Sequence, residues 1–179
     1  MAQSWRHDRQ VPPLDPAALE RLALRYVERY ATSRAKLAQY LQRKLRERGW
    51  SGDEAPDAHA LAERMASLGY VDDRGFAQSR AGALVRRGYG PRRIGQALKA
   101  AGIREEDAAP AQQDARAGAW DAALDLARRK RIGPFAGVAP DRAGREKAIG
   151  VLLRAGHDLA TARRLAEARP GEIPERDDR

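Results

Sequence analysis

The sequence predicts an all-α protein, a tandem repeat of three-helix units stacked into an elongated curved rod. Its composition is rich in alanine, leucine and arginine, with few β-branched runs, which favours helix. No segment alternates apolar and polar residues as a half-buried strand does. Signals that begin and end helices recur at regular intervals along the chain.

Three helices are predicted in the first unit from the residues at their ends. A short polar side chain accepts hydrogen bonds from the N–H groups of an opening turn, and glycine often follows the last turn. The first helix is predicted to start at Asp15-Pro16, the second after Thr32 or Ser33 as its cap, and the third from about Asp57, and the closing glycines are Gly49 and Gly69. The predicted helices therefore cover about residues 16–30, 34–48 and 57–68.

The same pattern recurs twice. The second unit is predicted to hold helices over 73–87, 91–101 and from about 105, and the third unit helices over 119–131, 141–155 and 158–168. The second helices align at Ser33, Gly90 and Gly144, offsets of 57 and 54 residues. Alanine-rich trios of this size have thin cores, so neighbouring units must stack. We expect a flexible tail over 1–14, repeats over 15–71, 72–117 and 118–169, and a disordered tail over 170–179.

Composition narrows the class of protein. The formal net charge is +9, from 34 basic and 25 acidic residues, which favours nucleic acid or an acidic protein surface as partner, although a solubility surface has the same composition. The absence of cysteine excludes disulfides and thiolate metal sites. With no long apolar run and no apolar core at the N-terminus, we expect a cytoplasmic monomer without membrane contact.

The excess of basic charge lies in the first 103 residues, and eight basic and no acidic residues occur from Arg74 to Arg104. Within it, a helix is predicted to begin at Gly90-Pro91, and its first turn would have free N–H groups beside two arginines. That arrangement favours a phosphate or carboxylate, although cations at a helix N-terminus are themselves unfavourable and are often only solvated. A second basic run lies in the first unit and is a solvated face by default. The contact candidates are Arg34, Lys36, Arg43, Lys44, Arg86, Arg87, Tyr89, Arg92, Arg93 and Lys99.

Other residues have simpler interpretations. The run Arg128–Arg131 ends a predicted helix, where cations are favoured by the dipole, so we interpret it as structural. No catalytic constellation, cofactor motif or metal-ligand spacing is present, and the protein is not expected to be an enzyme. The scattered histidines, His7, His59 and His157, are interpreted as surface residues, and the aromatic residues Tyr70, Phe76 and Trp120 as packing.

Three short pieces also resemble one known family. They are GYVDDRGFA at 69–77, RRGYGPRRI at 86–94 and LKAAGI at 98–103, in this order and at this separation. They resemble the signature of the RecX family, small bacterial regulators of the RecA recombinase. The resemblance extends more weakly to 23–41 and 145–158, covers roughly residues 17–168, and is interrupted over 132–140.

The resemblance implies three tandem three-helix units that bind RecA and RecA–DNA filaments. It also implies modulation, mostly inhibition, of recombinase, ATPase and coprotease activity in DNA repair and the SOS response. Two alternatives stay open. One is a direct DNA-binding protein of helix-turn-helix type, although Arg93 and Gln96 are a thin set of base-reading side chains. The other is a helical scaffold for an acidic protein partner.

Overall fold

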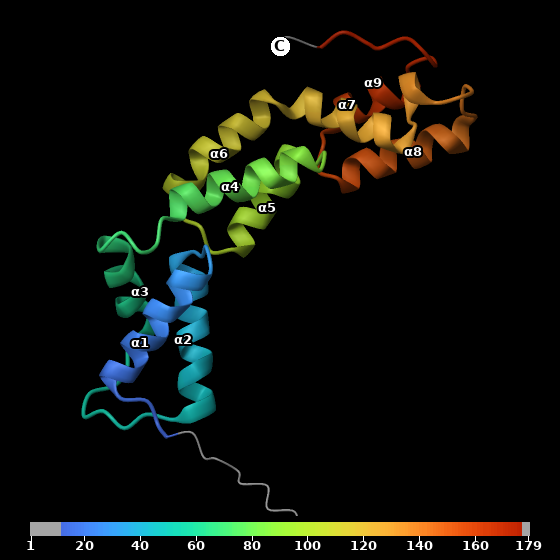
Figure 1. Cartoon of the computed structure of the whole chain (residues 1–179). Helices are drawn as coiled ribbons and strands as arrows, with labels where there is room; N and C mark the ends of the chain where they lie inside the picture. The colour runs from blue at the N-terminus through green and yellow to red at the C-terminus, as the bar shows by residue number, and fades with distance from the viewer. Residues whose placement is uncertain (1–11, 177–179) are drawn as a thin grey trace, which may run out of the picture. The chain divides into compact units, whose positions relative to one another are not determined.

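The computed structural model describes residues 12–176, and this part of the chain is helical, with nine α-helices, one short 3₁₀ turn and no strand (Figure 1). A single isolated bridge joins Leu14 to Trp50. The chain divides into two compact units, Met1–Asp72 and Asp73–Arg179. The predicted all-α fold is confirmed.

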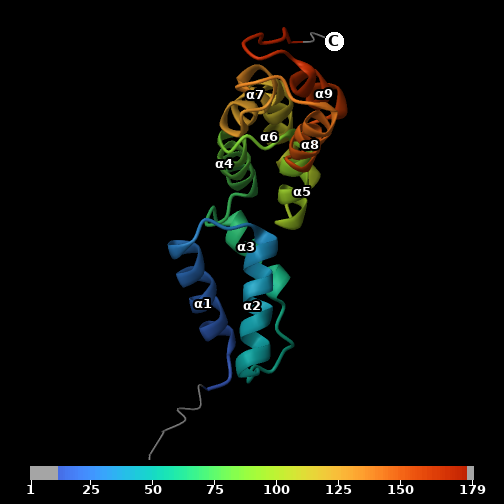
Figure 2. The ribbon, with the colours of Figure 1, turned by 90° about the vertical axis from the view of Figure 1, so that its right-hand side faces the viewer.

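The first unit contains α1 (Pro16–Arg29), α2 (Arg34–Arg48) and α3 (Ala58–Ser67). Its helices begin close to where the sequence predicts. The Asp15 carboxylate accepts from the N–H of Ala18, the Ser33 hydroxyl from that of Lys36, and the Asp57 carboxylate from those of His59 and Ala60. Helix α2 contacts both of the other helices, and Figure 2 shows it beside α1.

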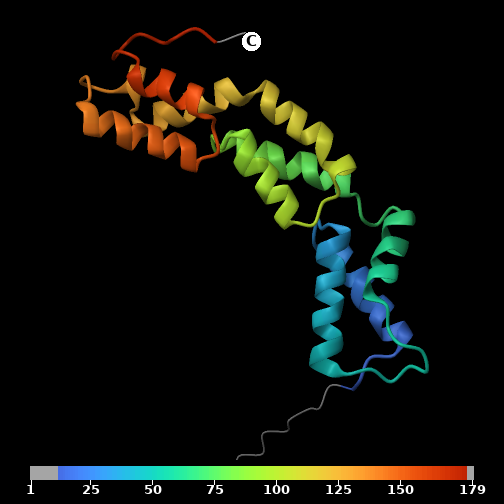
Figure 3. The ribbon, with the colours of Figure 1, turned by 180° about the vertical axis from the view of Figure 1, so that it is seen from behind.

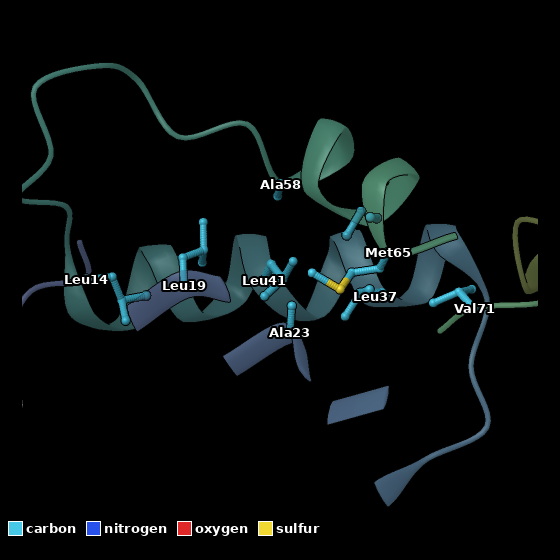
Figure 4. Packing of buried hydrophobic residues seen from close by; sticks show 10 residues of the cluster. Leu14, Leu19, Ala23, Leu37, Leu41, Ala58, Met65 and Val71 are labelled. Carbon is cyan, nitrogen blue, oxygen red and sulfur yellow. The ribbon is translucent and has the colours of Figure 1, made fainter. Parts of the chain in front are cut away.

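The core of the first unit forms around the apolar face of α2. Leu37 and Leu41 are fully buried there, and Met65 of α3 reaches toward Leu37 (Figure 4). Leu14 closes the core ahead of α1, where its N–H donates to the Gly49 carbonyl at 3.0 Å. Burial of these side chains provides the main stabilisation of the trio.

The second unit contains the other six helices. They are α4 (Asp73–Arg86), α5 (Pro91–Ala100), α6 (Glu105–Ala117), α7 (Ala119–Lys130), α8 (Arg142–Arg154) and α9 (Leu159–Glu167), with a 3₁₀ turn over Gly133–Phe135. We call α4–α6 the second trio and α7–α9 the third trio. Each trio has its own cluster of buried apolar residues, alanine-rich as the sequence predicts.

The predictions for one aromatic residue and one histidine are wrong. Tyr70 is 54% exposed in the link between α3 and α4, so it is not a packing residue. His157 is 1% exposed and lies inside the second unit, so it is not a surface residue. His59 is exposed as predicted, whereas His7 lies outside the described residues.

The segment after α9 contacts the second unit. The N–H of Gly171 donates to the Pro134 carbonyl at 2.8 Å, and the Arg176 guanidinium donates to the Ala117 carbonyl at 3.1 Å. Gly171 and Arg176 of the expected disordered tail therefore have defined contacts. Within residues 12–176, no helix is both long and apolar enough to span a bilayer, and no three acidic or histidine side chains gather as metal ligands would.

Candidate anion-binding site

The second and third trios meet end to end, where α5 begins and α8 ends. The N–H of Gly90 donates to the Ala155 carbonyl at 2.9 Å, and the N–H of Arg92 donates to the Gly156 carbonyl at 3.2 Å. Figures 1 and 3 show the end of α8 beside the link between α4 and α5. The positive end of one helix dipole thus meets the negative end of another, which satisfies polar groups that neither helix can satisfy alone. We call this contact the α5–α8 joint.

Two glycines make the close approach at the α5–α8 joint feasible. A β-carbon on Gly90 would lie 2.5 Å from the carbonyl of Gly156. A β-carbon on Gly156 would lie 2.5 Å from the backbone nitrogen of Arg93, and Gly156 has a φ of +95°. Only glycine fits two backbones at this separation and adopts this φ without strain.

The α5–α8 joint overturns one sequence prediction. The first turn of α5 was expected to offer free N–H groups to an anion, but Pro91 has none and the N–H of Arg92 is occupied by Gly156. The N–H of Arg93 donates to the Gly90 carbonyl at 3.1 Å. The prediction was wrong because the carbonyl that accepts from Arg92 belongs to Gly156, which follows α8 and lies more than fifty residues further along the chain.

His157 is buried at the same joint. Its Nε2 lies 3.0 Å from the Gly88 carbonyl oxygen, so Nε2 carries the hydrogen and donates it. Its Nδ1 is buried and has no hydrogen-bond partner among residues 12–176, as fits a neutral ring. Burial lowers the pKa of His157, outweighing the bond to Gly88 and the charge of Asp158, which both raise it.

A basic groove opens beside the α5–α8 joint, with a volume of about 470 Å³. The second trio contributes Arg87 and Tyr89, from the α4–α5 link, and Arg93 from α5. The third trio contributes cations from the last turns of α7 and α8. The complete lining is Arg87, Tyr89, Arg93, Leu126, Arg129, Lys130, Val151, Arg154 and Ala155. Five of these nine side chains are cationic and none is acidic, so the groove is suited to an anion.

Within residues 12–176, no carboxylate lies within 4 Å of any cation in the groove. Arg129 uses one nitrogen to donate to the Arg86 carbonyl at 3.1 Å, which ties α7 to the end of α4. The Arg93 guanidinium carbon lies 5.1 Å from the centre of the Tyr89 ring. Stacking on Tyr89 gives that guanidinium a defined position without neutralising it.

Three of the predicted contact residues, Arg87, Tyr89 and Arg93, line the groove. Arg86, Arg92 and Lys99 are exposed but do not line the groove. Sequence reasoning missed Arg129, Lys130 and Arg154. The first two belong to the run Arg128–Arg131, which was interpreted as structural. The sequence therefore showed the basic charge of this run but not its position beside Arg87 and Arg93.

Three of the four candidates in the first unit have acidic neighbours. Arg34 pairs with Glu63 at 3.2 Å. Lys44 and Arg43 share Glu47, at 2.6 and 3.6 Å. Lys36 is half-buried in the first turn of α2. Local compensation makes Arg34, Arg43 and Lys44 less attractive to an external anion than the groove cations are.

Comparisons of sequence agree on one family. Residues 72–111 match the family model described as RecX, second three-helix domain. A regulatory protein RecX of Myxococcus xanthus is 32% identical over 165 residues, covering 88% of this chain and 88% of the relative. A regulatory protein RecX of Xanthomonas campestris is 40% identical over 119 residues, covering 66% of this chain and 69% of the relative.

Solved structures agree at the level of the fold. The crystal structure of RecX from Lactobacillus salivarius superimposes with a TM-score of 0.58 at 18% identity, covering 82% of this chain and 90% of that one. A second crystal structure of a regulatory protein RecX gives a TM-score of 0.57 at 21% identity, covering 83% of this chain and 73% of that one. The fold of three-helix domains is therefore shared.

Proposed function

Because the chain belongs to the RecX family of regulatory proteins, we propose that it binds the RecA recombinase and RecA–DNA filaments and regulates them. The regulation is mostly inhibition, acting on recombinase, ATPase and coprotease activity in DNA repair and the SOS response. The observation that carries this proposal is the similarity to RecX along 88% of the chain. The protein acts by binding and without a cofactor.

The basic groove supports this proposal on physical grounds. A filament of recombinase on DNA presents phosphates and acidic protein surface to a regulator. Uncompensated cations at Arg87, Arg93, Lys130 and Arg154 attract such a surface, speed association and make it sensitive to salt. The candidates Arg34, Lys36, Arg43, Lys44, Arg86, Arg92 and Lys99 remain proposed peripheral contacts.

Direct reading of duplex DNA by a helix-turn-helix is a less suitable function. A recognition helix places its N-terminal residues against base edges in the major groove. The corresponding end of α5 is packed against α8 through Gly90 and Gly156, and a β-carbon at either glycine would already collide. The start of α5 is therefore not free to enter DNA.

The proposal is tested by titrating this protein into RecA that is hydrolysing ATP on single-stranded DNA. Strong inhibition well below stoichiometry is expected, because a regulator that blocks filament growth acts on many protomers at once. An unrelated basic helical protein of similar charge serves as control for sequestration of the DNA. Hydrolysis that is unchanged even at an excess of this protein would refute the proposal.

A further inference from the structure

The first unit has a groove of its own, with a volume of about 450 Å³, lined by the start of α1, the link from α2 to α3, and α3. We call it the acidic groove. We propose that it binds an extended segment of a partner protein that carries arginine or lysine beside apolar side chains. This inference goes beyond the proposed function, because it assigns a second binding surface to the other compact unit and a ligand of opposite charge.

Much of the lining of the acidic groove is apolar. Leu19 of α1 is buried, whereas Trp50, Pro56 and Leu61 are half-buried and Pro16 is exposed. Apolar surface that remains in contact with water is stabilised when an apolar side chain of a partner covers it. The groove therefore offers a contact for side chains such as leucine or valine.

Trp50 gives the acidic groove a wall of defined position. Its indole Nε1 donates to the Glu54 carbonyl at 2.7 Å. A β-carbon on Gly52 would lie 2.6 Å from the Trp50 ring, so the ring packs directly on the backbone of the link. The N–H of Ser51 donates to the Leu14 carbonyl at 2.9 Å, which ties the link to the segment ahead of α1. A wall held in this way before binding loses little freedom when a partner arrives.

The charge of the acidic groove is negative, in a chain whose formal net charge is +9. Its lining includes the carboxylates of Glu20, Asp53, Glu54 and Asp57, and one cation, Arg64, which pairs with Glu20. Within residues 12–176, no cation lies within 4 Å of the carboxylates of Asp53 and Glu54. This charge attracts a cationic partner and repels the phosphates of a nucleic acid.

A peptide segment satisfies both properties of the acidic groove. A small polyamine would balance the carboxylates but would leave the apolar lining in contact with water. In an extended peptide, successive side chains point to opposite sides, so apolar side chains can contact Trp50 and Leu61. Arginine and lysine have long stems, which let their charged ends reach the carboxylates of Asp53 and Glu54.

The test measures binding of a fluorescent peptide of alternating leucine and arginine by anisotropy, without RecA. Two comparison peptides have serine in place of leucine, or glutamate in place of arginine. The groove variant is Asp53→Asn/Glu54→Gln, at exposed positions outside any helix. The matched control is Asp114→Asn/Glu167→Gln, which removes the same charge from exposed positions that do not line the acidic groove. Thermal unfolding of all three proteins checks that the fold is kept.

Wild type and control should bind the leucine–arginine peptide equally, and the groove variant should bind it roughly tenfold more weakly. Both double variants raise the net charge by the same amount, so long-range repulsion of the peptide changes equally in the two. Ala55→Arg, which places a cation in the lining, should also weaken binding. Both comparison peptides should bind weakly to every protein.

Four results would overturn the proposal. They are no binding of the leucine–arginine peptide by wild type, equal losses in both double variants, equal binding of the serine peptide, and self-association of wild type that the groove variant loses. In the last two cases charge alone, or a second copy of this chain, would account for the groove. A chain without residues 1–11 that binds the peptide several-fold more tightly would overturn it as well, because the occupant would then be the chain's own segment. None of these results depends on RecA, so the proposed function is judged separately.

Discussion

His157 shows how one buried side chain makes the stability of the second unit depend on pH. Burial at the α5–α8 joint lowers its pKa below the ordinary value of 6.5. In the unfolded chain the imidazole is solvated and keeps the ordinary pKa. Between the two values the unfolded chain binds more protons, so stability falls as pH falls below about 6.5 and is complete above it.

His157→Gln is expected to flatten this dependence. Glutamine retains an N–H that can donate to the Gly88 carbonyl but does not titrate. Lowering the pH from about 7.5 to about 5.5 should reduce the free energy of unfolding more for wild type than for the variant. Denaturant unfolding at each pH measures this free energy. His59→Gln, at an exposed position of the first unit, is the control and should behave as wild type. Equal pH slopes for wild type and His157→Gln would contradict the assignment.

At the scale of residues, sequence reasoning succeeds where the cause is local. Asp15, Ser33 and Asp57 cap helices because their bonds reach only two or three residues along the chain. It fails for His157, whose partner Gly88 is 69 residues away. It fails for Tyr70 for a similar reason, since spacing along a helix does not show which face neighbouring elements cover.

At the scale of elements, the α5–α8 joint determines the geometry of the groove. The sequence predicts that Gly90 begins a helix and Gly156 follows one, as local turn signals. It does not predict that the two glycines meet, since that pairing depends on how the second and third trios stack. For the same reason Lys130 and Arg154, which end different helices, could not be assigned to one site with Arg87 from the sequence.

Gly90→Ala is expected to destabilise the second unit by about 1–3 kcal/mol, because its methyl group would overlap the Gly156 backbone. Gly95→Ala, in the middle of α5, is the matched control. A β-carbon there meets nothing within 4 Å, and alanine favours helix over glycine by roughly 1 kcal/mol, so this variant should be stabilised. The two free energies of unfolding should therefore change in opposite directions. Similar values for both variants would show that the close approach of the two backbones at the joint is absent in solution.

At the scale of the whole molecule, the predicted dependence of one trio on another is supported inside Asp73–Arg179. There the second and third trios share the α5–α8 joint, the Arg129–Arg86 hydrogen bond and the basic groove. The first trio has its own core and internal ion pairs within Met1–Asp72. Cooperative unfolding is therefore expected to follow the two compact units.

A chain truncated after Ile103 tests this dependence, because the cut removes α6, against which α4 packs, and α8, which satisfies the first turn of α5. We expect α1–α3 to remain folded and α4–α5 to lose helicity. Circular dichroism should then give fragments 1–103 and 1–72 nearly the same helical content per molecule. The longer fragment should also inhibit RecA less than the full chain does, since Arg129, Lys130 and Arg154 of the groove are gone. A 1–103 fragment with the thermal stability of the full chain would show that the second trio folds stably without the third. Stacking of the two trios would then form the groove without contributing to stability.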